Sequence, residues 1–296
     1  MRASSLPRLA FAGIGLMGLP MCQRLLAAGY PLVVWNRNPD KCAPLVALGA
    51  KQVLQRAELC AQADIIMLCL ADTQAVTEVM FSEQGIAAAM SNKQVLVDFS
   101  SIEPAATRSM AQQLAEGCGA QWLDVPVSGG VGGAEAGSLA MMAGGDADAL
   151  AQVMPVLAHL SQRITHMGTV GSGQVTKVCN QMLVACNAMV IAEVVALAER
   201  AGVDASLLAP ALAGGFADSK PLQILAPQMA GREFEPVKWH VRTLLKDLDM
   251  AVQLSHNHLS ATPMSGLAAQ LMRTHGAQGH LAADPATLIK LYSGDK

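Results

Sequence analysis

The feature that most constrains this chain is a glycine pattern close to its start, Gly13-Ile14-Gly15-Leu16-Met17-Gly18. The pattern directly follows the apolar run 9–12, which predicts a β-strand, and it precedes residues 20–28, which have helical character. In this context the first glycine permits a tight turn, the second lets backbone approach a pyrophosphate, and the third lets the helix pack on the strand. The positive end of the helix then faces the phosphate charge. We therefore expect the whole segment to bind a dinucleotide.

Apolar runs and helical stretches alternate as far as residue 168. Strands are expected at residues 9–12, 32–35, 65–70, 95–98, 122–125, 139–143 and 164–166, and helices at 20–28, 41–48, 73–80, 104–116 and 148–160. The strand candidates are continuously apolar, as is typical of strands that are buried on both faces. The alternation predicts an α/β fold, a Rossmann-type doubly wound parallel sheet.

The pattern changes after Gly168, and no strand is expected from Gln174 onward. Residues 172–201 repeat apolar side chains at three- and four-residue steps, which predicts one long helix. Further helices are expected at 207–212, 222–229, 239–257, 263–275 and 285–292. We expect an N-terminal NAD(P)-binding domain at 1–169 and an all-helical substrate and oligomerisation domain at 170–296, with the long helix joining them.

The residues after the second expected strand favour one of the two dinucleotides. An acidic residue there would bind the ribose 2′-hydroxyl of NAD. This chain instead has Asn36-Arg37-Asn38, followed by Lys41. A guanidinium pairs bidentately with a 2′-phosphate, and the two amides add neutral hydrogen bonds. We therefore expect the protein to prefer NADP to NAD as its cofactor, with Asn36, Arg37 and Asn38 in contact with it. The alternative is a solvated basic turn without selectivity.

Near the start of the long helix, Lys177 lies among the apolar residues Val175, Val178 and Cys179. Desolvation lowers the pKa of an ammonium group and lets a lysine donate a proton near neutral pH. Asn180 follows one turn later on the same face, where its amide can hold a substrate. The alternative for Lys177 is a solvated surface lysine.

A second substrate element is expected where the strand at 122–125 runs into Ser128-Gly129-Gly130. The Ser128 hydroxyl and the backbone N–H groups of the glycines suit a small carboxylate, although a flexible loop is the alternative. Farther along, Lys246-Asp247 lies in the expected helix 239–257. This pair is either a surface ion pair or a lysine that reaches back to the active-site cleft.

The amino-acid composition limits the classes of molecule that this protein is expected to bind. The net charge of -3, the 15% of charged residues and the lack of a basic run disfavour nucleic acid and anionic membranes. The uncharged run 178–192 contains Asn180, Gln181 and Asn187, which favours a buried helix over a membrane span. Seven cysteines without metal-ligand spacing indicate reduced thiols in a cytoplasmic protein and no metal site. The Ala-, Leu- and Met-rich second half predicts a homodimer or homotetramer.

At these positions the chain resembles the β-hydroxyacid dehydrogenase family, which includes 3-hydroxyisobutyrate dehydrogenase and tartronate semialdehyde reductase. Four motifs in order carry the resemblance, which covers nearly the whole chain: 13–21, 124–130, 173–180 and 246–248. The resemblance implies an NAD(P)-dependent oxidoreductase that interconverts a small β-hydroxyacid and its semialdehyde by hydride transfer.

The resemblance also implies roles for individual residues. Lys177 is the implied general acid/base, and Ser128, Gly129, Gly130 and Asn180 surround the substrate. Leu70, Ser101 and Lys246 lie near the cofactor. The segment 214–219 resembles the semialdehyde-reductase branch, so the implied substrate is tartronate semialdehyde (2-hydroxy-3-oxopropionate).

Three departures from the family pattern leave the substrate open. Gln181 stands where many members have a second asparagine, Cys69-Leu70-Ala71-Asp72 lacks the proline often found after the third strand, and 284–286 lacks the usual Asp-x-Ser. The alternatives are 3-hydroxyisobutyrate dehydrogenase and glyoxylate/succinic semialdehyde reductase. An imine reductase, which usually lacks the lysine, and a non-catalytic NADP-binding protein are more distant alternatives.

Overall fold

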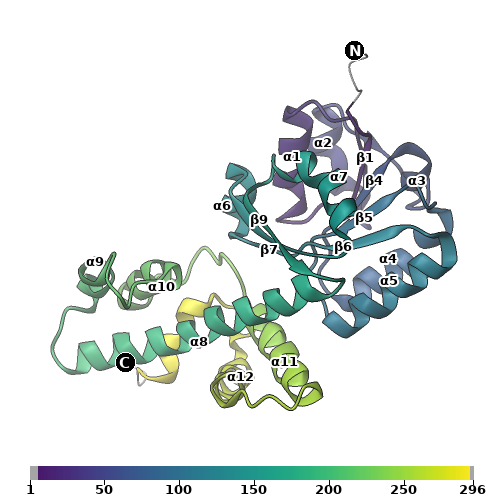
Figure 1. Ribbon diagram of the computed structural model, residues 1–296. Helices are drawn as coiled ribbons and strands as arrows, with labels where there is room; N and C mark the ends of the chain where they lie inside the picture. The colour runs from purple at the N-terminus through teal and green to yellow at the C-terminus, as the bar shows by residue number, and fades with distance from the viewer. Residues whose placement is uncertain (1–5, 294–296) are drawn as a thin grey trace. The chain divides into compact units, whose positions relative to one another are not determined.

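The computed structural model describes residues 6–293 (Figure 1), so the outermost ends of the two predicted domains lie outside it. The chain divides into two compact units, one up to Lys177 and the other from Val178 onward. The first unit is built on a β-sheet, and the second is helical.

Within the described residues the first unit contains a nine-stranded sheet, of which six strands are parallel in the order β3-β2-β1-β4-β5-β6. These strands are β1 (Leu9–Ala12), β2 (Leu32–Trp35), β3 (Lys51–Gln52), β4 (Ile65–Leu68), β5 (Val95–Asp98) and β6 (Gln121–Asp124). The order confirms the predicted doubly wound fold and places its switch point between β1 and β4.

Beyond β6 the sheet becomes mixed. β8 (Leu139–Gly144) pairs antiparallel with β6 and with β7 (Val127–Ser128), and parallel with β9 (Ser161–Gly168). β3 and β7 were not predicted, because two-residue strands are too short to show a period.

Helices cover both faces of this sheet. They are α1 (Gly18–Ala27), α2 (Ala43–Ala47), α3 (Glu58–Gln62), α4 (Thr73–Phe81), α5 (Pro104–Cys118), α6 (Gly130–Ala136) and α7 (Ala147–Leu157). Alternate residues of β1 belong to different apolar clusters, with Leu9 and Phe11 in one and Ala10 and Ala12 in the other. Burial of both faces explains why the strands are continuously apolar in sequence.

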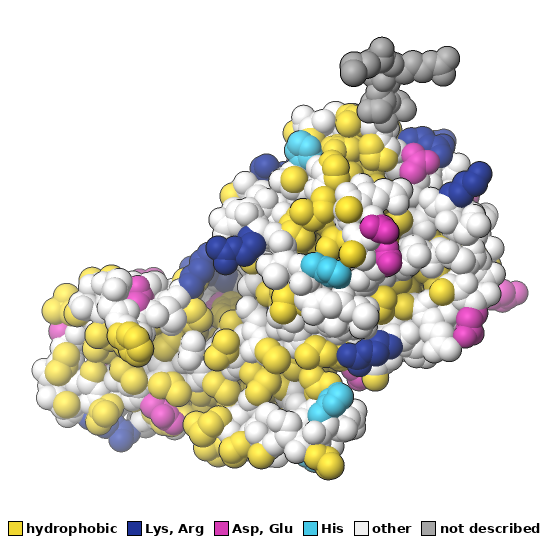
Figure 2. All heavy atoms as spheres, in the orientation of Figure 1, with side chains coloured by type: hydrophobic (Ala, Val, Ile, Leu, Met, Phe, Trp, Pro, Cys, Tyr) yellow, Lys and Arg dark blue, Asp and Glu magenta, His cyan; other side chains and the backbone are white. Residues whose placement is uncertain are grey.

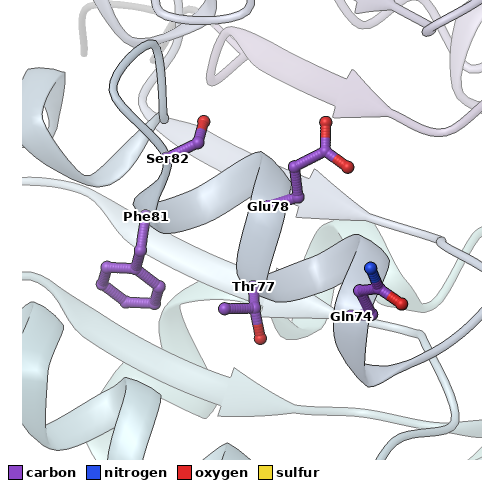
Figure 3. Close-up of a pocket in the computed structure, with 5 residues that line it drawn as sticks. All are labelled: Gln74, Thr77, Glu78, Phe81 and Ser82. Atoms are coloured by element: carbon purple, nitrogen blue, oxygen red, sulfur yellow. The ribbon is translucent and has the colours of Figure 1, made fainter.

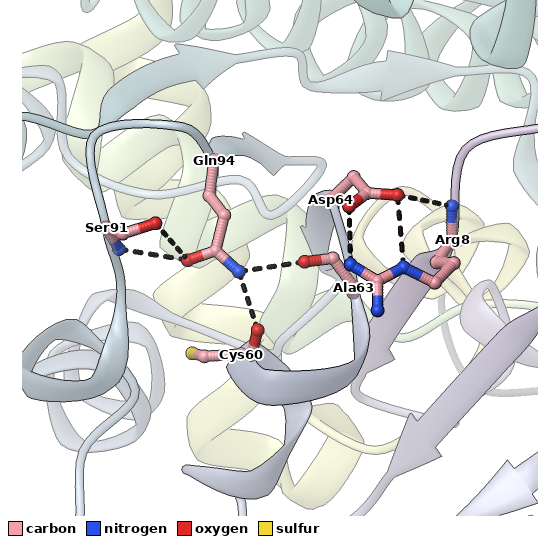
Figure 4. A network of polar contacts seen from close by, with 6 residues as sticks. All are labelled: Arg8, Cys60, Ala63, Asp64, Ser91 and Gln94. Carbon is pink, nitrogen blue, oxygen red and sulfur yellow. Dashed lines mark hydrogen bonds and ion pairs between the residues drawn. The ribbon is translucent and has the colours of Figure 1, made fainter.

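A polar network ties together the amino ends of the central strands (Figure 4). The buried Gln94, just before β5, donates hydrogen bonds to the carbonyl oxygens of Cys60 at 2.7 Å and Ala63 at 2.8 Å. The Arg8 guanidinium, just before β1, pairs with the Asp64 carboxylate at 2.7 Å, just before β4. These contacts lie at the sheet edge opposite the glycine pattern.

The second unit is organised on α8 (Ser172–Arg200), the predicted long helix, which begins within the first unit. It is joined by α9 (Leu208–Leu212), α10 (Lys220–Gly231), α11 (Val241–Asn257) and α12 (Pro263–His275). From Gln174 to Ser293 the structure contains no strand, as predicted.

By length and composition α8 could cross a membrane, since its most apolar window has a mean hydropathy of 1.9. One face of α8 packs within the second unit, however. Ala188, Ala192 and Val195 are fully buried in the apolar cluster of that unit. Part of the apolar surface of α8 therefore belongs to the core of this unit, while other apolar residues, among them Leu183 and Leu197, are exposed.

α12 ends on a fully buried histidine, His275. Its Nε2 lies 2.8 Å from the Thr287 hydroxyl, its Nδ1 has no hydrogen-bond partner among the described residues, and its ring stacks on His280. Burial, followed by the charges of His280 and Lys290, lowers the pKa of His275 from 6.5 to about 4. The folded protein therefore keeps this imidazole neutral over a range in which the unfolded chain would protonate it.

We expect acid to destabilise the protein through His275. The unfolded chain binds this proton below about pH 6.5 and the folded protein only near pH 4, so the free energy of unfolding should fall by about 3 kcal/mol from pH 7 to pH 4 through this residue. Urea unfolding across this range should show a weaker pH dependence for His275→Gln. His256→Gln, at an exposed position on α11, should match the wild type. Equal slopes for all three proteins would contradict the assignment.

Candidate functional site

The predicted cofactor residues of the first unit follow the carboxyl ends of the parallel strands, whereas Lys246 lies in the second unit. The sheet register aligns the last residues of five strands, which are Ala12, Trp35, Leu68, Asp98 and Asp124. The segments that follow them carry Gly13 to Gly18, Asn36 to Asn38, Leu70, Ser101 and Ser128. Ligands of doubly wound sheets bind outside this edge, beside the switch point.

The three glycines of the first loop differ in the space around them. A Cβ on Gly13, where φ is +106°, would collide with the carbonyl oxygen of Cys69, and one on Gly18 would collide with that of Gly13. A Cβ on Gly15 would meet nothing within 4 Å. Gly13 and Gly18 therefore serve packing, whereas Gly15 borders open space. No side chain caps the start of α1, and the backbone N–H groups of the loop at Gly15 lie beside open space, so the loop fits the phosphates of a dinucleotide.

Asn36 joins two loops at this edge. Its Oδ1 accepts a hydrogen bond from the Ile14 N–H at 2.9 Å, and its Nδ2 donates to the carbonyl of Asn38 at 2.8 Å. The neighbouring Arg37 is exposed, and its guanidinium forms no hydrogen bond or ion pair with the described residues. Arg37 and the nearby Lys41 are thus exposed at this turn, while the amide of Asn36 is engaged within the protein.

The start of α8 is bonded to the ends of β5 and β6. The Asp124 carboxylate accepts hydrogen bonds from the N–H groups of Gly171 at 2.8 Å and Gln174 at 2.9 Å. The Gln174 side chain donates to the carbonyl of Ser100 at 2.8 Å and accepts from the Ile102 N–H at 3.1 Å. These bonds hold the first turn of α8 against the carboxyl edge.

Two glycines permit this close approach. A Cβ on Gly144 would collide with the Asp124 carboxylate, and one on Gly173 would collide with the carbonyl oxygens of Met142 and Asp124. Lys177 comes one turn after Gly173 and is half-buried. The helical turn that carries Lys177 thus starts from a fixed position at the predicted cofactor edge.

Asp98 and Asp124 are neighbouring, fully buried carboxyl groups at this edge. Asp98 Oδ1 accepts from the Ser100 N–H at 2.9 Å, and its Oδ2 has no hydrogen-bond partner among the described residues. Burial raises the pKa of Asp98 to about 7, and it raises the pKa of Asp124 despite the N–H groups that bind it. The two carboxyl groups and Gln174 were not among the predicted site residues. The sequence signals that could have identified them are the acidic residue in each of the two apolar runs, 95–98 and 122–125, and the glutamine between Gly173 and Lys177.

The predicted carboxylate cradle lies on regular structure rather than on a flexible loop. Ser128 pairs opposite Ala140 in β7, and Gly129 and Gly130 follow with φ values of +134° and +63°. A Cβ on Gly130 would meet nothing within 4 Å. The hydroxyl of Ser128 and the backbone N–H groups beside open space are the kind of donors that bind a small carboxylate.

In the second unit a chain of polar contacts links Asn180 to Lys246. Asn180 Nδ2 donates to Gln181 Oε1 at 2.7 Å, and Gln181 Nε2 donates to Asp247 Oδ2 at 2.5 Å. Lys246 Nζ lies 3.4 Å from Asp247 Oδ1, and this carboxylate is buried. The pair Lys246-Asp247 is therefore an ion pair with a buried acid. Gln181, which departs from the family pattern, bridges it to Asn180.

A separate hollow lies along α4 (Figure 3). It is lined by Gln74, Thr77, Glu78, Phe81 and Ser82, all on or directly after that helix. None of the predicted site residues is among them, so this hollow is not part of the candidate site.

Comparisons with known proteins agree with this geometry. Residues 8–168 match the NAD-binding domain of 6-phosphogluconate dehydrogenase, and residues 171–292 match the NAD-binding region of NADP-dependent 3-hydroxyisobutyrate dehydrogenase. The chain is 36% identical to 2-hydroxy-3-oxopropionate reductase of Escherichia coli (strain K12), over 96% of each chain. It is 33% identical to 3-hydroxyisobutyrate dehydrogenase of Pseudomonas aeruginosa, over 97% of this chain and 98% of that one.

A solved structure extends the comparison to three dimensions. The 3-hydroxyisobutyrate dehydrogenase of Mycobacterium tuberculosis with L-serine aligns with a TM-score of 0.85 at 29% identity, over 96% of this chain and 98% of that one. The sequence and structure matches cover both units and include the dinucleotide loop and the helix that carries Lys177. The chain is thus an NAD(P)-dependent oxidoreductase that acts on a CH–OH group, and it belongs to the 3-hydroxyisobutyrate dehydrogenase family of β-hydroxyacid dehydrogenases.

Proposed function

We propose that this enzyme reduces tartronate semialdehyde (2-hydroxy-3-oxopropionate) to glycerate and prefers NADP to NAD. One observation carries the reaction: Lys177 directly follows the turn of α8 that is bonded to the carboxyl edge of the dinucleotide-binding sheet. The substrate is supported by the 36% identity to the E. coli reductase and by the segment 214–219. The free thiols of all seven cysteines support a cytoplasmic location.

In this proposal the residues divide the work between binding and proton transfer. Ser128, Gly129 and Gly130 hold the substrate carboxylate through hydroxyl and N–H donors. Bound NAD(P)H supplies the hydride that the carbonyl carbon receives. The Lys177 ammonium stabilises the negative charge that develops on the carbonyl oxygen, and its Nζ then gives that oxygen a proton. In the direction of oxidation the neutral amine accepts the alcohol proton.

Asn180 supports Lys177 from one turn farther along α8. In the proposed role its amide orients the reacting oxygen by a hydrogen bond. Asn180 Nδ2 donates a hydrogen bond to the Gln181 side chain, and Gln181 Nε2 in turn donates to the buried Asp247. These two hydrogen bonds fix the orientation of the Asn180 amide. We infer that Asn180 Oδ1 faces the substrate hydroxyl.

A substrate and cofactor panel tests the proposal. We expect the highest kcat/KM for tartronate semialdehyde with NADPH, above 3-hydroxyisobutyrate, L-serine, glyoxylate and succinic semialdehyde. Arg37→Gln should remove the preference for NADPH, because the exposed guanidinium is the group proposed to bind the 2′-phosphate. Faster turnover of a cyclic imine would identify an imine reductase. NADPH binding without oxidation by any carbonyl compound would indicate a non-catalytic protein.

Replacing Lys177 tests the mechanism directly. Lys177→Ala should lower kcat by about 100- to 10,000-fold, the usual contribution of general acid catalysis, while NADPH affinity measured by fluorescence titration stays unchanged. Lys177→Arg should also be inactive, because a guanidinium keeps its proton at neutral pH. Lys93→Ala, at an exposed lysine before β5, is the control. Near-wild-type turnover in either Lys177 variant would refute the role.

We further propose that the protein is a homodimer or homotetramer that associates through an exposed apolar face of α8. Leu183, Val190, Val194 and Leu197 recur at helical spacing and are 37% to 69% exposed. Figure 2 shows apolar side chains gathered on the surface of the helical unit. A continuous apolar stripe of this kind marks a protein interface.

Charge on this stripe should separate the subunits. The double variant Leu183→Glu/Leu197→Glu should lower the mass measured by light scattering, because a carboxylate buried in an apolar interface is strongly unfavourable. Leu54→Glu, at a 77% exposed position in the first unit, should leave the mass unchanged. A monomeric wild type at micromolar concentration would contradict the proposed assembly.

A further inference from the structure

The Gln174 side chain forms hydrogen bonds with the backbone on both sides of Ser101, a predicted cofactor residue. The side chain is 1% exposed, and its amide binds the carbonyl oxygen of Ser100 and the N–H of Ile102. These two groups lie on either side of Ser101. The Gln174 amide therefore uses both its N–H donor and its oxygen acceptor to fix the peptide groups around Ser101.

The backbone of Gln174 is held from a second direction. Its N–H donates to Asp124 Oδ2, and the Gly171 N–H donates to Asp124 Oδ1. Gly144 and Gly173 leave no room for a side-chain carbon between the helix and the sheet. The first turn of α8 therefore cannot move closer to the sheet, and its position along the edge is set by Asp124 and Gln174.

Ser100 extends the network to the loop after β4. Its hydroxyl oxygen accepts a hydrogen bond from the Leu70 N–H at 2.9 Å, and its own N–H donates to Asp98 Oδ1 at 2.9 Å. The loops that carry Leu70 and Ser101 are thus joined to the turn that precedes Lys177. Gln174 is the residue that connects the helix to both loops.

We propose that Gln174 is a positioning residue that sets Lys177 at the correct distance and angle from the cofactor loops at Leu70 and Ser101. The inference rests on the proposed function of Lys177. Lys177 follows three residues later on the same helix, so a shift of the first turn moves the lysine with it. Misplacement of a reacting group by about 1 Å can cost 100-fold in rate. Gln174 itself makes no contact with substrate or cofactor in this role.

Two substitutions distinguish positioning from simple stabilisation. Gln174→Met keeps the length of the side chain and removes both hydrogen-bonding groups. Gln174→Glu keeps the acceptor for the Ile102 N–H but can donate to the Ser100 carbonyl only when its carboxyl group is protonated. Burial near the carboxyl groups of Asp98 and Asp124 favours the protonated form. Gln174→Glu should therefore recover the native bonds as the pH falls.

We expect Gln174→Met to lower kcat at least about tenfold while the substrate KM changes less than about threefold, because the substrate cradle at Ser128 is untouched. Gln174→Glu should approach the wild-type kcat near pH 6 and lose it toward pH 9, relative to the wild-type profile. A residue that only stabilises the fold would lower the melting temperature without this pH-dependent recovery. The assays are run well below the melting temperature of each variant.

Thr176→Val is the matched control on the same turn, since the Thr176 hydroxyl donates to the Ser172 carbonyl of its own helix at 2.8 Å and to no other described residue. It should keep the wild-type kcat. Wild-type kcat in Gln174→Met beside an inactive Lys177→Ala would overturn the role of Gln174 alone. Turnover by Lys177→Ala would instead refute the proposed function.

The test also covers two further outcomes. If Gln174→Met does not fold, the pH profile of Gln174→Glu decides, and a profile parallel to that of the wild type overturns the proposal. If no substrate of the panel is turned over, NADPH affinity decides, because displaced Leu70 and Ser101 loops should raise the dissociation constant at least about threefold. An unchanged dissociation constant would then overturn it.

Discussion

The buried carboxylate of Asp124 is the interaction on which the arrangement of this edge depends. It accepts hydrogen bonds from the N–H of Gly171, just before α8, and from the N–H of Gln174 in the first turn of α8, where helix N–H groups have no partner within the helix. Buried N–H groups without partners are strongly unfavourable, so the carboxylate selects one placement of the helix. Gly144 and Gly173 make that placement possible because any side-chain carbon would occupy the space of the contact.

The two edges of the sheet serve different purposes. At the amino edge, the side chains of Gln94 and Asp64 form hydrogen bonds with backbone groups. These bonds link the segments that precede β1, β4 and β5. At the carboxyl edge, Gly15 and Gly130 border open space, and Arg37 is exposed. A parallel sheet aligns all its carboxyl ends on one side, so loops that are distant in sequence are collected there into one binding edge.

Much of the fold could be predicted because its signals are local. The strands of the Rossmann sheet are continuously apolar, the glycine loop combines turn and packing requirements, and α8 repeats apolar residues over its full length. The strands and α-helices that were missed are β3, β7, α3 and α6, which are two to seven residues long. Their existence depends on pairing and packing with neighbours, and so few residues cannot display a period.

The amino-acid sequence by itself determined the fold class, the dinucleotide loop and the list of candidate site residues, because periodicity, turn chemistry and motif spacing are properties of neighbouring residues. Only the tertiary structure decided how those residues are held. The amide of Asn36 binds Ile14, Gln174 binds Ser100 and Ile102, and Gln181 binds Asp247. These bonds join residues 22 to 74 positions apart, and such partners are set by the packing of strands and helices, which no local pattern records.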